Sequence, residues 1–340
     1  MTDLRIEPLA NHPTYEKVRD LDKGEEVAIK FIQLGPRFYS KYVERELFNH
    51  RLLAHPHIVS FKEVFITSHW LAIVMEYVGG GNLQQYVEKK SRLPEWEARC
   101  FFQQLILALD YCHRSVNVAH RDIKLGNILL NTKYAIPILK ICDFGYSKNM
   151  ILNSIPKTRV GTAAYISPEV ARSQGDCAYD TEKADVWSCG VTLYCMLAGR
   201  YPFVDVDQQI RLRRIQDLTQ ADVATALSKL RGVSAECVSL LQRVLQVDPV
   251  KRLALLQIME DPWFRQFLPD LSKLNLAPPK DTQAESEIKA ILTDAERLSH
   301  LRSQTSFDED ELEHDMDDIL AEIDPNADIA DMDRSDGMPY

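Results

Sequence analysis

One ordered series of short polar motifs constrains the fold of this chain more than its composition does. Its two central motifs each lie beside a run of apolar residues that is typical of a strand. The series consists of Lys30, then His120-Arg121-Asp122, Asn127, Asp143-Phe144-Gly145 and Ser167-Pro168-Glu169. Asp143 follows Asn127 by 16 residues. We reject a chance origin for this combination of order and spacing, although any one of the motifs alone would be weak evidence.

The apolar patterns predict a small β-rich part followed by a mostly helical part, which is an α+β fold with two lobes. Short apolar runs rich in β-branched residues predict strands at 26–33, 71–78, 128–130 and 139–141. Residues at helical spacing predict helices at 42–54, 82–89, 95–113 and 184–197.

Three parts follow from these patterns. A short N-terminal lobe is expected at 15–78, a C-terminal lobe at 79–268 and a tail at 269–340. Pro269 and the pair Pro278-Pro279 mark the start of the tail. Within the tail we expect a helix at about 285–299 and an acidic segment at 307–336. Residues 1–14 show no clear periodicity and are expected to form a loose leader.

The charge of the chain is concentrated in its tail. Residues 301–340 hold 14 acidic residues and two arginines, a net −12; subtracting this from the chain's −10 leaves +2 for the rest. A nearly neutral body with an acidic tail argues against nucleic-acid binding. No apolar run approaches the length of a membrane span. The 7 cysteines form no CxxC pair, which predicts reduced thiols in a cytoplasmic or nuclear protein.

From Val27 to Phe267 the chain resembles a eukaryotic protein kinase, because protein kinases use this residue set to move the γ-phosphate of ATP to a hydroxyl. Finer motifs resemble the second subfamily of plant and green-algal sucrose-nonfermenting-related kinases, which act in osmotic and abscisic-acid stress signalling. These motifs lie at 45–51, 61–64, 141–148 and 185–194.

The resemblance implies a role for each motif residue. Asp122 would serve the substrate hydroxyl, Lys124 would neutralise the γ-phosphate, and Asn127 with Asp143 would hold Mg²⁺. Other implied roles are structural: Phe144 packs under the helix that carries Glu46, Glu169 pairs with Arg252, and Asp185 holds the catalytic-loop backbone. The residues that would bind ATP are Lys30, Glu46, Glu76, Val78 and Asp143.

The position of Lys124, two residues after Asp122, is the mark of serine/threonine specificity in this family. Arg121 and Lys148 would form a cationic pocket for a phosphorylated residue of the activation segment. The best phosphosite is Thr158, and Ser154 is a second candidate.

The tail has two further implications. Ile288, Ile291, Leu292, Ala295 and Leu298 form an apolar stripe, and in the family a helix here packs on the helix that bears the catalytic glutamate. The acidic segment contacts regulatory phosphatases in some members. We therefore expect protein substrates, with an upstream kinase or a phosphatase as further partners, and no nucleic acid or membrane.

Two features depart from the family. Gly24 is the only glycine before Lys30, whereas a phosphate-binding loop needs several. Either a faulty gene model has removed a segment from the sequence, or the part of the N-terminal lobe that covers the nucleotide is truly reduced. For the sequence as written, we expect a sheet without its first strand and weak binding of ATP. Gly126 replaces a glutamate that helps relatives to recognise a basic substrate residue, so the usual Arg-x-x-Ser/Thr preference is in doubt.

Two functions fit these observations. The favoured one is an ATP- and Mg²⁺-dependent serine/threonine protein kinase of stress signalling. The alternative is a pseudokinase or scaffold with impaired ATP binding. Retention of every catalytic lysine and acidic group favours the first, and the missing glycines favour the second.

Overall fold

The computed structural model describes residues 6–11, 15–20, 25–35, 38, 40–134, 136–144, 162–173, 179–203, 208–268 and 283–302. The chain divides into two compact units. The first unit comprises 1–44, 61–77 and 281–340, and the second comprises 45–60 and 78–280. No helix in the described part of the chain is long and apolar enough to cross a membrane.

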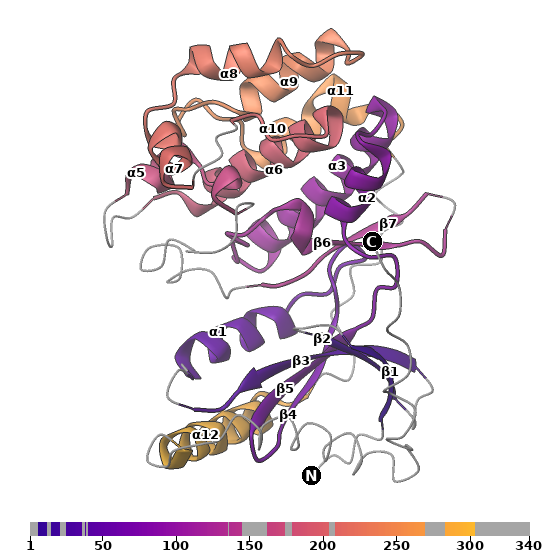
Figure 1. The fold of residues 1–340 in the computed structure, drawn as a ribbon, viewed down its shortest axis with the longest axis vertical. Helices are drawn as coiled ribbons and strands as arrows, with labels where there is room; N and C mark the ends of the chain where they lie inside the picture. The colour runs from indigo at the N-terminus through magenta and orange to yellow at the C-terminus, as the bar shows by residue number, and fades with distance from the viewer. Residues whose placement is uncertain are drawn as a thin grey trace, which may run out of the picture. The chain divides into compact units, whose positions relative to one another are not determined.

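The first unit is built on an antiparallel sheet of five strands in the order β1-β2-β3-β5-β4 (Figure 1). The strands are β1 (Ile6–Asn11), β2 (Tyr15–Asp20), β3 (Glu25–Gln33), β4 (Phe61–Ile66) and β5 (Trp70–Glu76). Val27, Ile29, Ala72 and Val74 are fully or almost fully buried and form a small apolar cluster. Strand alternation therefore places Lys30 on the other face of the sheet.

The expectation that the sheet lacks its first strand, with a loose leader before it, is wrong. Ile6–Asn11 forms β1 and pairs with β2, with a register shift between Pro8 and Ala10. An edge strand tolerates proline because one side of its backbone needs no ladder partner. Strand β1 forms because its backbone pairs with β2, although its residues do not alternate between apolar and polar side chains.

Helix α12 (Glu285–Arg302) packs against the edge strand β4 (Figure 1). Ile288, Leu292 and Ala295 are buried, so the apolar stripe seen in the sequence does face the protein. Gln283, just before the helix, accepts the N–H of Val64 at 2.9 Å and donates to its carbonyl oxygen at 3.0 Å. The segment that leads into α12 thus covers backbone polar groups of the sheet edge.

The second unit is mostly helical and also contains the two-stranded sheet of β6 (Ile128–Asn131) and β7 (Ile138–Ile141). Helix α1 (Ser40–Arg51) enters it at Arg45. The other helices are α2 (Leu83–Lys90), α3 (Glu95–Asp110), α5 (Pro168–Arg172), α6 (Thr181–Ala198), α7 (Gln208–Gln216), α8 (Gln220–Leu227), α9 (Ala235–Val244), α10 (Leu255–Glu260) and α11 (Pro262–Arg265).

Helix α6 forms the centre of this unit and packs beside α3 (Figure 1). Its residues Trp187, Val191 and Leu193 are fully buried, as expected for a helix that is apolar on nearly all sides. Asp180 caps its N-terminus by accepting two backbone N–H groups. Gly199 ends it in the left-handed conformation, at φ 66°.

Helix α3 ends earlier than its apolar pattern predicts. The pattern continues to His113, but the α-helix stops at Asp110 and a π-helical turn, η1 (Tyr111–Ser115), follows. π-turns inside helices are often found at functional sites, because they redirect the side chains beyond them. Here the turn precedes the polar motifs that begin at His120.

Candidate active site

A short loop of the second unit brings three predicted catalytic residues together. Lys124 Nζ lies 2.6 Å from Asp122 Oδ2, and Asn127 Nδ2 donates to the same oxygen at 2.8 Å. Asn127 also donates to the backbone carbonyl of Asp122 at 3.0 Å. Within the described residues Asp122 Oδ1 accepts no hydrogen bond, so it is available to a substrate hydroxyl.

This loop is held from below by Asp185 of α6, as expected. Its Oδ1 accepts the N–H of Arg121 at 2.7 Å, and its Oδ2 accepts the N–H of His120 at 2.8 Å. His113 Nε2 donates to Asp185 Oδ2 at 2.9 Å. The side chains of His113 and Asp185 are each only 1% exposed. Buried, charge-assisted hydrogen bonds of this kind fix the loop backbone firmly.

The backbone held by Asp185 is strained. Arg121 has φ 69° and Asp143 has φ 68°. Non-glycine residues rarely occupy this left-handed region, and they do so at functional sites where the surroundings enforce the conformation. At Arg121 the enforcing contact is its own N–H bond to Asp185.

Three rings connect the catalytic loop with α1. The Phe144 ring meets the His120 ring edge-on, with centroids 4.7 Å apart, and stacks on the His50 ring at 5.8 Å. All three residues are buried. His50 lies one helical turn after Glu46 on α1. The prediction that Phe144 packs under the helix carrying Glu46 is therefore confirmed.

The oxygens of Asn127 and Asp143 suit a magnesium ion. Cys142 N–H donates to the carbonyl oxygen of Asn127 at 3.0 Å, which brings the residue before Asp143 against the loop. The hydrogen bonds from Asn127 to Asp122 use the amide nitrogen of Asn127, so they leave its side-chain oxygen available to a metal ion. The described residues contain no cluster of three or more His, Cys, Asp or Glu that could hold a metal alone. Mg²⁺ needs no such cluster, since it keeps waters and phosphate oxygens as ligands.

The predicted ATP-binding residues lie in both units. Lys30 on β3 is 7% exposed and Glu76 ends β5, both in the first unit. Glu46 on α1 is 4% exposed and Val78 is 7% exposed, both in the second unit. A buried lysine and a buried glutamate are uncommon without a functional or structural partner.

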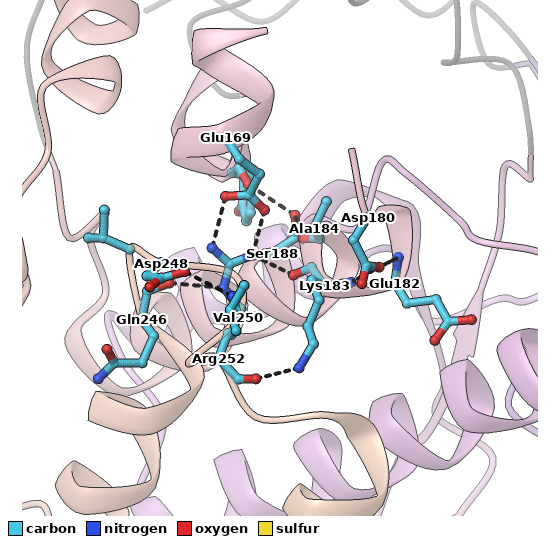
Figure 2. Close-up of polar contacts among 12 residues, drawn as sticks. Glu169, Asp180, Glu182, Lys183, Ala184, Ser188, Gln246, Asp248, Val250 and Arg252 are labelled. Atoms are coloured by element: carbon cyan, nitrogen blue, oxygen red, sulfur yellow. Dashed lines mark hydrogen bonds and ion pairs between the residues drawn. The ribbon is translucent and has the colours of Figure 1, made fainter. Parts of the chain in front are cut away.

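Downstream of the loop, a buried ion pair anchors the motif Ser167-Pro168-Glu169. The carboxylate of Glu169 accepts two hydrogen bonds from the Arg252 guanidinium, at 2.6 and 2.9 Å (Figure 2). Arg252 is also positioned by the carbonyl oxygens of Lys183 and Gln246 and by the Trp187 ring. This confirms the predicted pair and fixes the start of α5.

The short helix η3 (Thr162–Tyr165) joins this anchor to the catalytic loop. The Tyr165 hydroxyl accepts the N–H of Leu125 at 3.3 Å, and its carbonyl accepts the hydroxyl of Ser188 at 3.0 Å. Burial raises the pKa of the Tyr165 phenol, which keeps it protonated. The sequence analysis missed both Tyr165 and His113, because their partners lie 40 and 72 residues away.

The candidate phosphosites Thr158 and Ser154 lie outside the described residues, as do Gly145, Lys148 and the acidic segment 307–336. Arg121 is the described member of the predicted cationic pocket. Its Nε is buried and has no hydrogen-bond partner among the described residues.

Comparisons with known proteins agree with this geometry. The protein kinase domain family matches residues 14–264. An abscisic acid-inducible protein kinase of Triticum aestivum is 42% identical over 323 residues, covering 90% of this chain and 94% of the relative. Serine/threonine-protein kinase SRK2E of Arabidopsis thaliana is 42% identical over 330 residues, covering 92% and 89%.

Serine/threonine-protein kinase SAPK2 of Oryza sativa subsp. indica is 49% identical over 254 residues, covering 74% of this chain and 72% of the relative. Two of these relatives are named serine/threonine-protein kinases and one is named a protein kinase, and all three share most of their length with this chain. With the family match across the site described above, they show that the chain belongs to the protein kinase family.

Proposed function

We propose that this chain transfers the γ-phosphate of ATP to serine and threonine hydroxyls of protein substrates in stress signalling. One observation carries the proposal: Lys124 and Asn127 both donate to Asp122 Oδ2. Oδ1 accepts no hydrogen bond among the described residues and can therefore receive the acceptor hydroxyl. The names of the relatives support the same chemistry.

Asp122 would orient the hydroxyl and accept its proton as the bond to phosphorus forms. The ammonium of Lys124 would neutralise charge on the transferred group while keeping its ion pair with Asp122. Because both partners are already in place, little reorganisation is needed when the substrate binds.

Asn127 and Asp143 would hold Mg²⁺ through their side-chain oxygens, and Lys30 with Glu46 would orient ATP. The ion, when bound, supplies neutralisation of the phosphate oxygens. Glu76 and Val78 would contact the nucleotide base. The packed rings of His50, Phe144 and His120 support this proposal because they connect the backbone beside Asp143 to α1.

For regulation, we propose activation by phosphorylation at Thr158 or Ser154. A phosphate there would pair with Arg121, whose buried Nε lacks a partner among the described residues. We further propose that the acidic tail binds a regulatory phosphatase or an upstream kinase. None of the six described cysteines forms a disulfide, which supports a cytoplasmic or nuclear location.

The test is transfer of radiolabelled phosphate from Mg-ATP to a generic basic protein. The full chain is compared with Asp143→Asn and with the matched control Asp217→Asn, which changes an exposed aspartate at the end of α7. We expect Asp143→Asn to lose roughly 100-fold or more of the rate, since the ion ligand acts directly on the transferred charge. Asp217→Asn should stay within about twofold.

Equal background signal from wild type and Asp143→Asn would contradict the proposal and favour the scaffold. In that case, thermal denaturation with and without Mg-ATP would show no stabilisation of a folded chain.

A further inference from the structure

Gly126 lies at the side of the catalytic loop, between two residues that hold the catalytic aspartate. Lys124 and Asn127, on either side of it, contact Asp122 Oδ2 at 2.6 and 2.8 Å. Gly126 belongs to the short helix η2 (Leu125–Asn127) and is half-buried. A peptide whose hydroxyl sits at Asp122 can therefore place a side chain beside Gly126 from a position within a few residues of its acceptor.

The backbone at Gly126 does not require glycine. Its φ lies outside the left-handed region, so an L side chain would not be strained there. Among the described residues, a Cβ added at this position would meet a single atom within 4 Å, Gln84 Oε1 at 3.7 Å, which is an ordinary van der Waals contact. The missing side chain thus leaves space next to Gln84 of α2, the helix that packs on η2.

The one α2 side chain that reaches this space among the described residues is an uncharged amide, that of Gln84. Gln84 turns its Oε1 toward Gly126, while its Nε2 donates to Glu88 at 2.9 Å. Asn82 and Gln85 are engaged in the N-terminal capping box of α2, at 2.9 and 3.1 Å. Glu88 lies one turn further along the helix and is already held by Gln84.

From these contacts we infer that Gln84 and Gly126 form a neutral subsite for a substrate side chain that flanks the acceptor. The inference rests on the proposed function and deepens it by naming the substrate class. An uncharged side chain can fill the space and donate an N–H or O–H to Gln84 Oε1. Among the described residues no carboxylate lies within 4 Å of a Cβ at position 126, and the Glu88 carboxylate on α2 is held by Gln84 Nε2 at 2.9 Å. A lysine or arginine in this space therefore has no direct charged partner to offset the loss of its hydration. The substrates are therefore serine or threonine segments that need no basic residue at this flank.

The test measures kcat/KM of the full chain on peptides that share one acceptor and differ at one flanking position at a time. Each position carries glutamine or arginine in turn. For wild type we expect the arginine-to-glutamine ratio to stay within about threefold everywhere. Gly126→Glu should raise that ratio by about tenfold at one position, and added salt should reduce the gain.

Gly126→Gln is the matched control, because it fills the same space without charge; its ratio should follow wild type. Gln84→Glu is a second variant, which places the carboxylate on α2 and should raise the ratio at the same position. All ratios are taken within one variant, so a general loss of rate does not affect them.

A wild-type ratio above about tenfold at any flanking position would overturn the neutral subsite. So would an unchanged ratio in both Gly126→Glu and Gln84→Glu. Either result would leave the kinase assignment intact, since transfer itself occurs. Absence of transfer from Mg-ATP to every peptide and to a generic basic protein would instead overturn the proposed function, and the subsite with it.

Discussion

At the scale of single residues, His55 and His57 form a buried pair whose protonation opposes folding. Their ring centroids lie 5.4 Å apart, and His55 also stacks on Tyr111 at 5.2 Å. Burial, with smaller contributions from the partner His57 and Lys140, lowers the pKa of His55 from 6.5 to about 3. Burial also lowers the pKa of His57 from 6.5 to about 4, with a hydrogen bond to the Leu139 carbonyl opposing the shift.

Since both values are depressed, the unfolded chain binds protons that the folded chain does not between pH 6.5 and about 4. The free energy of unfolding should therefore fall as the pH falls through this window, by about 1.4 kcal/mol per pH unit for each histidine. Urea unfolding at pH 7 and pH 5 measures the effect. From about pH 8 upward, where both states are unprotonated at these histidines, the pair should have almost no influence on the slope.

The double variant His55→Asn/His57→Asn should flatten this dependence. Asparagine at 55 can accept the N–H of residue 57, as His55 Nδ1 does at 3.1 Å. Asparagine at 57 can donate to the Leu139 carbonyl, as His57 Nδ1 does. His300→Asn, an exposed change on α12, should keep the wild-type slope. Parallel pH profiles for wild type and the double variant would contradict the assignment.

Single residues also show what could be predicted from the sequence. The roles of Asp185 and of the pair Glu169 and Arg252 were predictable because the resemblance to protein kinases implies them, and the structure confirms the contacts. His113 was not predictable. It resembles any polar residue at the end of an amphipathic helix, and only the tertiary fold brings it to Asp185, 72 residues away.

At the scale of secondary structure elements, α12 and its leading segment protect the edge of the sheet. Gln283 hydrogen-bonds to both the N–H and the carbonyl of Val64 on β4. Lys289 of α12 also lies within electrostatic range of Glu44 on α1. In the family, a helix of the tail is expected beside the helix that bears the catalytic glutamate. The interaction between Lys289 and Glu44, both in the first unit, agrees with that expectation.

We predict that Gln283→Ala exposes the backbone of β4. Hydrogen exchange at the Val64 amide should become roughly tenfold faster or more, because a net hydrogen bond of about 1 kcal/mol or more is lost there. Lys289→Ala is the control, since its ion pair with Glu285 is exposed and contributes little. Unchanged exchange at Val64 in Gln283→Ala would show that the edge is protected by other means.

Elements with strong periodicity were predictable, and the exceptions have physical causes. The strand at 26–33 and the buried helix at 184–197 appear as β3 and α6 with ends that differ by a few residues. Strand β1 was missed because Ile6–Asn11 contains Pro8 and no alternation, so only its pairing with β2 reveals it. The end of α3 was placed too late, because a π-turn continues the apolar pattern that an α-helix begins.

At the scale of the whole molecule, we expect the two departures from the family to act on different steps. Gly126 would affect the choice of substrate, and the lack of glycine before Gly24 would weaken the binding of ATP. The structure has all five strands of its first sheet, so the reduction concerns the connection between β1 and β2 and not the sheet itself. The residues between β1 and β2 in the sequence, His12, Pro13 and Thr14, lie outside the described residues.

Protein kinases cover the ATP phosphates with a glycine-rich loop. Proline lacks an N–H, and side chains keep the neighbouring amides from approaching phosphates closely, so we expect a high KM for ATP in the wild type. Replacing His12, Pro13 and Thr14 by glycine should lower this KM by about tenfold. It should leave kcat at saturating ATP within about twofold, because such a loop binds ground and transition states alike. Lys133→Gly, in the exposed turn between β6 and β7, should change neither. An unchanged KM would mean that tight binding of ATP depends on groups other than this connection. A rise in kcat instead would mean that the connection acts on the transferred phosphate itself.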